Sequence, residues 1–290
     1  MFAGIIVTGN IQIKKDHLEA SGTPHVSMWQ CPLIVSNIVV GNAIIDRDLH
    51  RNYLEDYKEV ARAAKSYGSL VLGQLSHPGR QVSITIQPYP ESSSGIEHPP
   101  TSGVLFARPT PLTKDGIRDI VRRFAYAASF LQKAGFDGVQ VKRFSTLFEV
   151  TLTSWQIHAA HGYLVHQFLS RRTNNRTDEY GGILQNRVRL LLEIIAEIKR
   201  VVNDPTFLIS VKINCEDSIP NGVDAEESII TAKMLEAVAV DLIEISGRVY
   251  EPEEPSIQQK VSLVWFVRKI VISCILVPDS FFCCTGSILH

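Results

Sequence analysis

Short apolar runs alternate with amphipathic segments along the first 250 residues of the chain. Five of these runs have the continuous apolar character of strands buried in a parallel sheet, at residues 3–7, 69–75, 138–141, 207–213 and 242–246. Apolar positions at helical spacing predict helices at residues 49–66, 117–134, 184–202 and 225–237. This alternation predicts an α/β fold in which helices cover a parallel sheet.

Turn and capping residues define the ends of several of these elements. A turn at residues 8–10 should end the first strand, and Thr113 is a plausible cap for the helix that Gly135 ends. Residues 87–108 are rich in Pro, Ser and Gly and predict a long loop. An open doubly wound sheet would produce the same alternation. No GxGxxG motif follows any of the five strands, which disfavours a dinucleotide-binding sheet.

The composition excludes some classes of protein. At 290 residues with 45% hydrophobic content, the chain can bury the core of one barrel-sized domain or of two small ones. The formal net charge is −1 and no basic stripe interleaves with aromatic residues, so we expect no nucleic-acid partner. The N-terminus lacks the pattern of a signal peptide, and the five cysteines show no CxxC spacing. We therefore expect a cytoplasmic protein with no membrane segment and a small-molecule substrate.

Two histidines and a tyrosine lie within six residues, in the motif HAAHGY at 158–163. The motif follows an apolar strand-like run and precedes a loop rich in charge and glycine, which is where α/β barrels place their catalytic groups. With QLSHPGRQ at 74–81 and NRTDEYGG at 175–182, it closely resembles the old yellow enzyme-like NADH:flavin oxidoreductases. The resemblance covers residues 2–250 and implies a (β/α)8 TIM barrel that binds FMN.

The resemblance places both histidines and the tyrosine of the first motif against the flavin. As neutral donors, His158 and His161 could bind one substrate oxygen and stabilise the charge that develops as hydride arrives. Tyr163 is implied to donate a proton to the substrate, which suits a phenol because it is neutral at pH 7. The alternatives are a metal site on the histidine pair, histidines that only satisfy the core, and a tyrosine that only anchors its loop. No third ligand with matching spacing follows, so we expect no metal.

Four further residues are implied to bind the flavin. Gln74 offers a donor and an acceptor together, as the pyrimidine edge of a flavin requires. Lys212 lies in an otherwise apolar strand and would place a cation where reduced flavin is negatively charged. Thr8 and Gly9 resemble the backbone that flanks the flavin in the family. The structural alternatives are a loop-tethering amide at Gln74 and a lysine that extends to the rim of the barrel.

Other charged residues are interpreted as structural. The charge-dense turns at 77–80 and 175–178 should stabilise their loops, and Arg187 and Arg189 should face solvent or acidic partners. Asp178 and Glu179 are adjacent, so their side chains point in different directions and make a poor hydrolase pair.

The function implied by the resemblance is that of an FMN-dependent oxidoreductase. Such an enzyme passes hydride from NADH or NADPH through the flavin to an activated alkene, an enone or a related acceptor, in a ping-pong scheme. Two alternatives stay open. The chain could be a catalytically inactive fragment of such a barrel, or a metal-dependent TIM-barrel hydrolase that uses His158 and His161.

The number of strands departs from the family pattern. A closed barrel needs eight strands and typically about 250 residues, whereas five strands are predicted. We therefore expect residues 1–250 to form a partial, FMN-binding TIM-barrel domain that lacks the first and the last two strands. Residues 251–290 lack the glycine-rich strand-loop repeats that the resemblance implies and are expected to form an atypical tail.

A second departure lies inside the strand that leads to the histidines. Residues 141–156 separate GVQ at 138–140 from IHAAH at 157–161, and their removal joins the two pieces without a seam. The first codons of the segment can encode a splice donor, and its last codon can encode a splice acceptor. We hypothesise a retained in-frame intron; the alternative is a natural loop insertion, which barrels tolerate at the carboxyl rim.

Overall fold

A computed structural model describes residues 5–19, 43–49, 53–101, 103–136, 153–205, 207–247, 249–251 and 281–284. The strands of its main sheet are β1 (Ile5–Gln12), β2 (Ala43–Ile44), β3 (Leu70–Ser76), β6 (Thr153–Ala159), β7 (Phe207–Asn214), β8 (Leu242–Ser246) and β9 (Phe281–Cys284). Every pairing in this sheet is parallel, and the strand order is β2-β1-β3-β6-β7-β8-β9. The predicted α/β class with a parallel sheet is confirmed.

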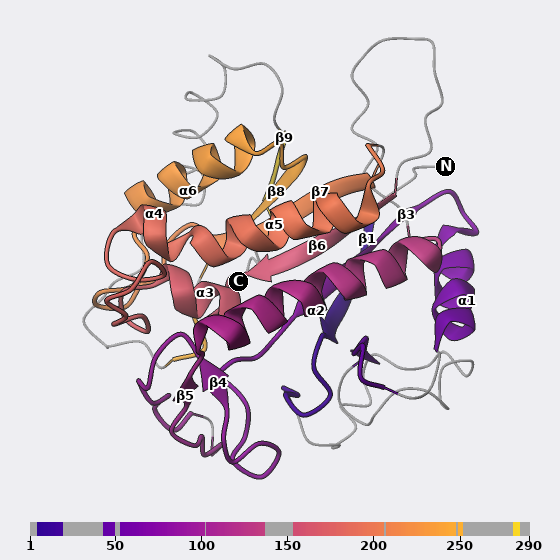
Figure 1. Ribbon diagram of the computed structural model, residues 1–290. Coiled ribbons are helices and arrows are strands. Elements are labelled where there is room, and N and C mark those ends of the chain that lie inside the picture. The colour runs from indigo at the N-terminus through magenta and orange to yellow at the C-terminus, as the bar shows by residue number, and fades with distance from the viewer. Residues whose placement is uncertain are drawn as a thin grey trace, which may run out of the picture.

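The helices lie between the strands in the chain. They are α1 (Leu54–Lys65), α2 (Lys114–Lys133), α3 (Leu164–Leu169), α4 (Leu184–Arg187), α5 (Arg189–Val202) and α6 (Ala225–Ala237). Figure 1 shows α2 and α5 side by side across one face of the sheet, where they contact each other. The predicted long loop contains a small parallel pair, β4 (Glu91–Ser92) and β5 (Thr110–Pro111). Among the described residues, no helix is both long and apolar enough to cross a membrane.

The predicted helix boundaries agree with the structure at most positions. Thr113 caps α2 as predicted, because its hydroxyl accepts the backbone N–H of Gly116 at 3.1 Å. The helix predicted over 184–202 is instead two helices, α4 and α5, which meet at Val188. Helix α3 was not predicted, because six buried residues leave no polar face to give a helical period.

The turn predicted at residues 8–10 is wrong. Strand β1 continues through these residues to Gln12, with a shift of register against β3 between Val7 and Asn10. Such an irregularity accommodates extra residues in one strand without ending its pairing. After the shift, β1 continues to pair with β3 and also pairs with β2. Thr8 and Gly9 therefore lie inside a strand.

The strand predicted at 138–141 lies outside the described residues. Its expected place between β3 and β7 is filled by β6, which begins at Thr153 and runs into the histidines. The last four residues of the predicted insertion thus belong to the backbone of a strand.

We propose that residues 141–156 are nevertheless an insertion, and that their deletion preserves β6. Deletion would place GVQ of residues 138–140 at the positions of residues 154–156, so the parallel pairing to β3 and β7 could re-form. We expect the deletion variant to unfold at a temperature equal to or above that of the full chain. The deletion removes the entropic cost of closing a long loop, and the strand keeps its pairing to both neighbours. A variant that circular dichroism shows to be unfolded would contradict the proposal.

The sheet forms an open arc. No pairing joins β2 to β9 within the part of the chain that the structure describes. Four of the five predicted strands are β1, β3, β7 and β8, and β6 lies in the place expected for the fifth. These strands are contiguous in the sheet, with β2 added at one end and β9 at the other. One of these, β9, comes from the predicted tail and pairs with β8, so this part of the tail continues the sheet.

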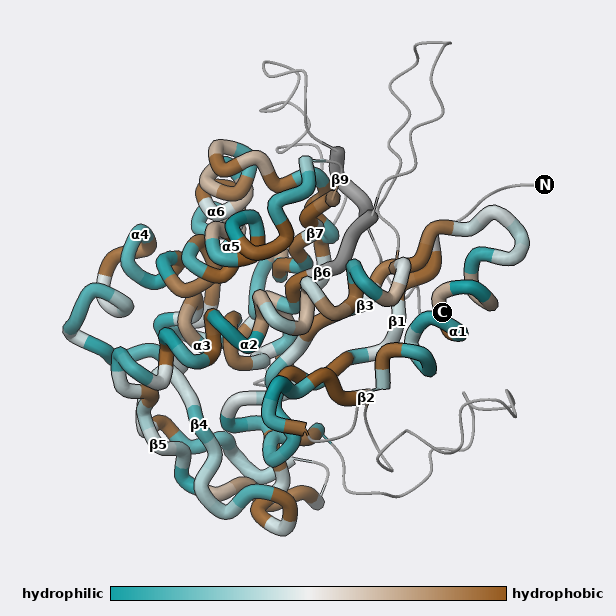
Figure 2. The backbone as a smooth tube through the Cα atoms, turned by 45° about the vertical axis from the view of Figure 1, so that its right-hand side comes forward, coloured by the Kyte–Doolittle hydropathy of each residue, from teal (hydrophilic) through white to brown (hydrophobic). Residues whose placement is uncertain are grey.

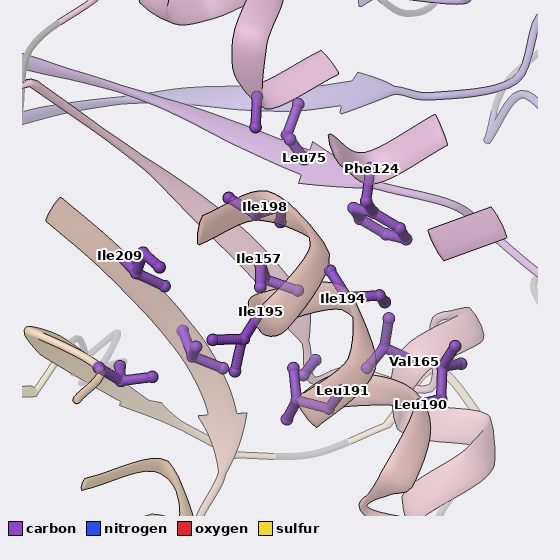
Figure 3. Close-up of a cluster of buried hydrophobic side chains, with 14 of the residues drawn as sticks. Leu75, Phe124, Ile157, Val165, Leu190, Leu191, Ile194, Ile195, Ile198 and Ile209 are labelled. Atoms are coloured by element: carbon purple, nitrogen blue, oxygen red, sulfur yellow. The ribbon is translucent and has the colours of Figure 1, made fainter. Parts of the chain in front are cut away.

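The two faces of the sheet differ in character. Ile11, Leu75, Ile157, Val211 and Ile243 occupy one register row across five strands, and all are buried. Figure 3 shows the neighbourhood of this row under α5, whose hydrophobic residues face it. In Figure 2, where hydrophobic residues are brown, such residues recur along β3 and α5. Full burial of one such side chain stabilises the fold by about 1.5–3 kcal/mol. The opposite face carries a small apolar cluster of Leu72, Leu208 and Leu242 toward the amino ends of the strands, and polar side chains toward their carboxyl ends.

Candidate active site

Polar side chains lie on the face of the sheet opposite the main core, near the carboxyl ends of the strands. Side chains alternate along a strand, so the residue after each apolar one points to this opposite face. His158, Lys212 and Glu244 are register partners on β6, β7 and β8. Gln74 on β3 pairs with Gln156, two residues before His158. The predicted residues Gln74, His158 and Lys212 therefore share one face, near the carboxyl ends of their strands.

A tight turn after β6 brings the three rings of the HAAHGY motif together. His161 and Gly162 both have left-handed backbone, with φ of 57° and 81°. The left-handed backbone of Gly162 favours glycine, and a Cβ there would also require the end of the Gln81 side chain to move, because it would lie 2.1 Å from Oε1. The ring centroids of His158 and Tyr163 are 4.6 Å apart, those of the two histidines 4.9 Å, and those of His161 and Tyr163 6.5 Å.

The hydrogen bonds of His158 determine which of its nitrogens carries the proton. Its Nδ1 accepts the backbone N–H of Ala160 at 3.3 Å. A neutral imidazole with an acceptor at Nδ1 carries its proton on Nε2 and can donate it. His161 is held at two points, because Nε2 bonds to the hydroxyl of Ser246 at 2.6 Å and its backbone N–H donates to Oδ1 of Asn214 at 3.3 Å.

Both imidazoles are neutral near pH 7. Burial lowers the pKa of His158 well below its ordinary value, and the charges of His161 and Lys212 act in the same direction. Burial and then Lys212 lower the pKa of His161 to about 4, although Glu244 opposes them. Each neutral ring carries one N–H that can donate a hydrogen bond.

Tyr163, at the start of α3, is partly buried, and the sequence did not suggest the groups that influence it. Burial raises the pKa of Tyr163 well above its ordinary value, and the negative charge of Glu19 raises it further. The Asn10 amide in turn donates to Oε1 of Glu19 at 2.5 Å.

The residues predicted to hold a cofactor are positioned by their neighbours. Gln74 donates from Nε2 to Oδ1 of Asn10 at 2.5 Å, and its backbone N–H donates to the hydroxyl of Thr8 at 2.9 Å. Nothing lies within 4 Å of the position that a Cβ of Gly9 would occupy. Thr8 thus positions Gln74, whereas Gly9 borders open space.

Lys212 forms an ion pair on the polar face. Its Nζ lies 2.9 Å from Oε1 of Glu244, and both side chains are largely buried. Glu244 was missed by the sequence analysis. Like Lys212, Glu244 is a charged residue inside an otherwise apolar strand, and this could have identified it. Because side chains alternate between the two faces along a strand, the buried Ile243 and Ile245 on either side place Glu244 on the polar face.

A second set of residues supports the site from behind. His166 of α3 lies 2.8 Å from Oδ1 of Asp217, and Asn214 donates to the same oxygen at 2.9 Å. Asn214 also accepts the backbone N–H of His161. This buried polar group, which the sequence analysis did not identify, connects α3 and β7 to the turn that carries His161.

The charged loops have the structural role that was predicted. Arg80 donates to the backbone oxygens of Ile96 and Glu97 and pairs with Glu251. Of the two surroundings predicted for Arg187, solvent or an acidic partner, the structure shows the acidic partner. Arg187 is 1% exposed and bonds to Glu227 and to backbone oxygens, because it lies where α4 packs against the neighbouring elements.

The geometry also bears on the metal alternative. Among the described residues, three potential metal ligands come together only at His17, His77 and Glu91, within 4.8 Å of one another and without the histidines of the site. The Glu91 backbone N–H donates to Nε2 of His17 at 3.2 Å, and the Gly79 N–H donates to Nδ1 of His77 at 3.0 Å. His77 therefore carries its proton on Nε2, where an ion would need a lone pair.

Comparison with known proteins identifies the family. The model of the NADH:flavin oxidoreductase / NADH oxidase family matches residues 37–147 and 152–270. The chain belongs to this family. The NADH-dependent flavin oxidoreductase nadA of Aspergillus parasiticus is 39% identical over 249 residues, which are 86% of this chain and 48% of that protein. The NADPH dehydrogenase of Bacillus subtilis is 33% identical over 207 residues, 70% of this chain and 54% of that protein.

The chain spans about half the length of these curated relatives. Among solved structures, the old yellow enzyme homologue of Zymomonas mobilis superposes with a TM-score of 0.63 at 22% identity, covering 96% of this chain and 75% of that one. The fold is thus the α/β barrel fold of the old yellow enzyme homologues, and the described strands form an open arc of it. FMN, with NADH or NADPH as reductant, is the cofactor set of the family.

The polar face fits a flavin in the chemistry that it offers. The amide nitrogen and oxygen of Gln12 and the hydroxyl of Ser76 have no hydrogen-bond partner within the described residues, although both side chains are fully buried. Gln12 and Ser76 are register partners, and each lies two residues after Asn10 or Gln74 on the same face. An unsatisfied buried polar group costs about 1–3 kcal/mol. A ligand rich in donors and acceptors would offset that cost, as the pyrimidine edge of a flavin can.

Proposed function

We propose that this chain is an FMN-dependent oxidoreductase that takes hydride from NADH or NADPH and passes it to an activated alkene, an enone or a related acceptor. Bound FMN would supply the hydride transfer, in a ping-pong scheme in which the two substrates occupy one place in turn. The observation that carries the proposal is the cluster of the buried His158 with the partly buried His161 and Tyr163, whose rings lie 4.6–6.5 Å apart beside Lys212.

In this proposal the histidines bind the oxygen of the acceptor. His158 has an Nε2–H to donate, and both rings are neutral near pH 7. Neutral donors that are already in place stabilise the negative charge that develops on a carbonyl or nitro oxygen, and they require no reorganisation during the reaction. Ser246 and Asn214 hold His161 in position for this task.

Tyr163 supplies the proton that completes the reduction. It is neutral at pH 7 and its ring lies against that of His158, so an acceptor whose oxygen is bound by His158 would bring its adjacent carbon atoms toward the Tyr163 hydroxyl. Gln74 and Lys212 would hold the flavin, with the lysine cation opposite the negative charge of the reduced ring. Thr8 fixes the backbone of Gln74, and Gly9 leaves room for the cofactor to approach.

The test is FMN binding and its dependence on Lys212. We expect the purified chain to bind FMN, and NADH or NADPH to bleach its visible absorption. Lys212→Met should weaken FMN binding about 10- to 100-fold, because a charge-assisted hydrogen bond contributes about 1.5–3 kcal/mol. Fluorescence quenching of FMN measures this change.

Two controls accompany this measurement. Lys212→Met also removes the ion pair with Glu244, so the double variant Lys212→Met/Glu244→Gln separates the loss of the cation from the loss of this ion pair. Lys58→Met removes a half-exposed lysine from α1 and should leave FMN binding unchanged. A chain that binds no FMN, or in which NAD(P)H does not reduce bound FMN, would favour the alternative of an inactive relative.

A further inference from the structure

Three hydrogen-bonded side chains, Glu19, Asn10 and Gln74, form a line that ends at the glutamine expected to hold FMN. Asn10 and Gln74 are register partners on the neighbouring strands β1 and β3. Nε2 of Gln74 lies 2.5 Å from Oδ1 of Asn10, and Nδ2 of Asn10 lies 2.5 Å from Oε1 of Glu19. Gln74 is buried, whereas Asn10 and Glu19 are partly exposed. The line therefore runs from a partly exposed carboxylate to a buried amide.

The carboxylate dictates the direction of both amides. An ionised carboxylate accepts hydrogen bonds and donates none, so Asn10 must present its NH2 group to Glu19. The carbonyl of Asn10 is then left for Gln74, which must present its own NH2 group to it. The reversed arrangement would set the Asn10 carbonyl against the Glu19 carboxylate, with two acceptors 2.5 Å apart. Of the two directions that each amide could take, the line permits one.

The end of the line leaves the carbonyl of Gln74 for a ligand. The backbone N–H of Gln74 donates to the Thr8 hydroxyl and its Nε2 donates to Asn10, so both contacts hold the residue from β1. Its Oε1 has no hydrogen-bond partner among the described residues, and it is not one of their fully buried unpartnered atoms. This oxygen therefore faces space that a ligand can enter.

We propose that Glu19 and Asn10 are positioning residues that turn the Gln74 amide so that its carbonyl faces the N3–H of FMN. This inference rests on the proposed function. The pyrimidine edge of a flavin presents one N–H between two carbonyl oxygens, so an amide beside it must place its oxygen opposite that N–H. The second proton on Nε2 of Gln74 stays available for a neighbouring carbonyl. The line thus selects a ligand that has a donor at this place.

The decisive variant is Glu19→Lys, because an ammonium group donates hydrogen bonds and accepts none. The ammonium would take the carbonyl of Asn10, and the NH2 group of Asn10 would take the carbonyl of Gln74. The NH2 group of Gln74 would then face the N3–H, donor against donor. FMN affinity should fall about 10- to 100-fold, because polar groups are left unsatisfied in a buried place. Quenching of FMN fluorescence by the purified chain measures the affinity.

The double variant Glu19→Lys/Asn10→Asp should restore the affinity of the unaltered chain. A carboxylate at position 10 accepts on both sides, so it binds the ammonium and returns the NH2 group of Gln74 to its original direction. A role of Glu19 that is only structural would not be rescued in this way. The matched control Glu59→Lys makes the same change of charge at an exposed position of α1 and should leave FMN affinity unchanged.

Two NMR signals report the directions of the amides. With FMN labelled with ¹⁵N at N3, the N3–H proton should lie downfield in the unaltered chain, move upfield in Glu19→Lys and return in the double variant. Without FMN, one proton of the Asn10 NH2 group should lie downfield because it donates to Glu19, and Glu19→Ala should remove that shift. Asn10→Asp identifies this resonance, because it deletes the NH2 group.

An unchanged FMN affinity and N3–H resonance in Glu19→Lys would overturn the proposal, as would a double variant that binds FMN no better than the single one. If Glu19→Lys does not fold, the Asn10 resonance decides, and an unshifted resonance in Glu19→Ala would overturn the proposal as well. An unaltered chain that binds no FMN would count against the proposed function, while the Asn10 resonance would still show which way the amides point.

Discussion

Replacing Tyr163 with phenylalanine should slow the reduction of an enone by the FMN-loaded chain about 100-fold or more, and leave the reduction of bound flavin by NAD(P)H nearly unchanged. The reason is that only the reaction with the alkene requires a proton from the protein. The substitution removes one hydroxyl and keeps the ring, which lies 4.6 Å from that of His158. The packing around the two histidines is therefore preserved.

Stopped-flow absorbance separates the two half-reactions and gives each rate. Tyr67→Phe is the matched control, because Tyr67 is 77% exposed and lies outside the site. It should leave both half-reactions unchanged. Equal losses in the two half-reactions of Tyr163→Phe would show that the hydroxyl positions the cofactor or the histidines, and is not the proton donor.

Replacing Asp217 with alanine should lower the free energy of unfolding by about 3–5 kcal/mol, because removal of one partner leaves a buried polar group uncompensated. Asp217 is 1% exposed and bonds to His166 and Asn214. Its Oδ2 also accepts the backbone N–H of Val223 at 2.7 Å. Urea denaturation at pH 7 measures the loss, and Asp115→Asn, at an exposed position of α2, should change stability by less than about 1 kcal/mol.

The pH dependence of the same contribution follows from the pKa of Asp217. Burial alone would raise this pKa, but the charge and hydrogen bond of His166, with two further hydrogen bonds, lower it below the ordinary value. A carboxyl whose folded pKa is depressed stabilises the fold fully above its unfolded pKa of about 3.9. This stabilisation is lost as pH falls through the lower folded pKa. The difference between the unaltered chain and Asp217→Asn should therefore shrink below about pH 4; a difference that grows there would contradict this assignment.

The elements that the sequence predicted well are those whose pattern depends on local physics. Helix α6 was predicted with its exact observed bounds, and β8 likewise. The cap at Thr113 could be predicted because it depends only on residues of the first helical turn, whose free N–H groups the threonine hydroxyl accepts. The predicted turn at residues 8–10 failed because pairing to two neighbouring strands overrode the local preference of glycine for a turn.

The candidate site divides in the same way. His158, His161, Tyr163, Gln74 and Lys212 were identified from motifs, and the structure brings them to one face. Glu19, Glu244 and Asp217 were missed. Their partners lie 9, 32 and 51 residues away along the chain, at Asn10, Lys212 and His166, and no local pattern reports contacts over such separations.

The sequence by itself determined that strands and helices alternate, that the strands are buried, and which residue types gather around the HAAHGY motif. These properties depend on the period of hydrophobic positions and on short motifs, which are local. The tertiary structure decided which strands are neighbours, which side chains share a face of the sheet, and which nitrogen of His158 carries the proton. It decided these because register and burial arise only when distant segments pack together, and the pKa values and hydrogen bonds of the site follow from that packing.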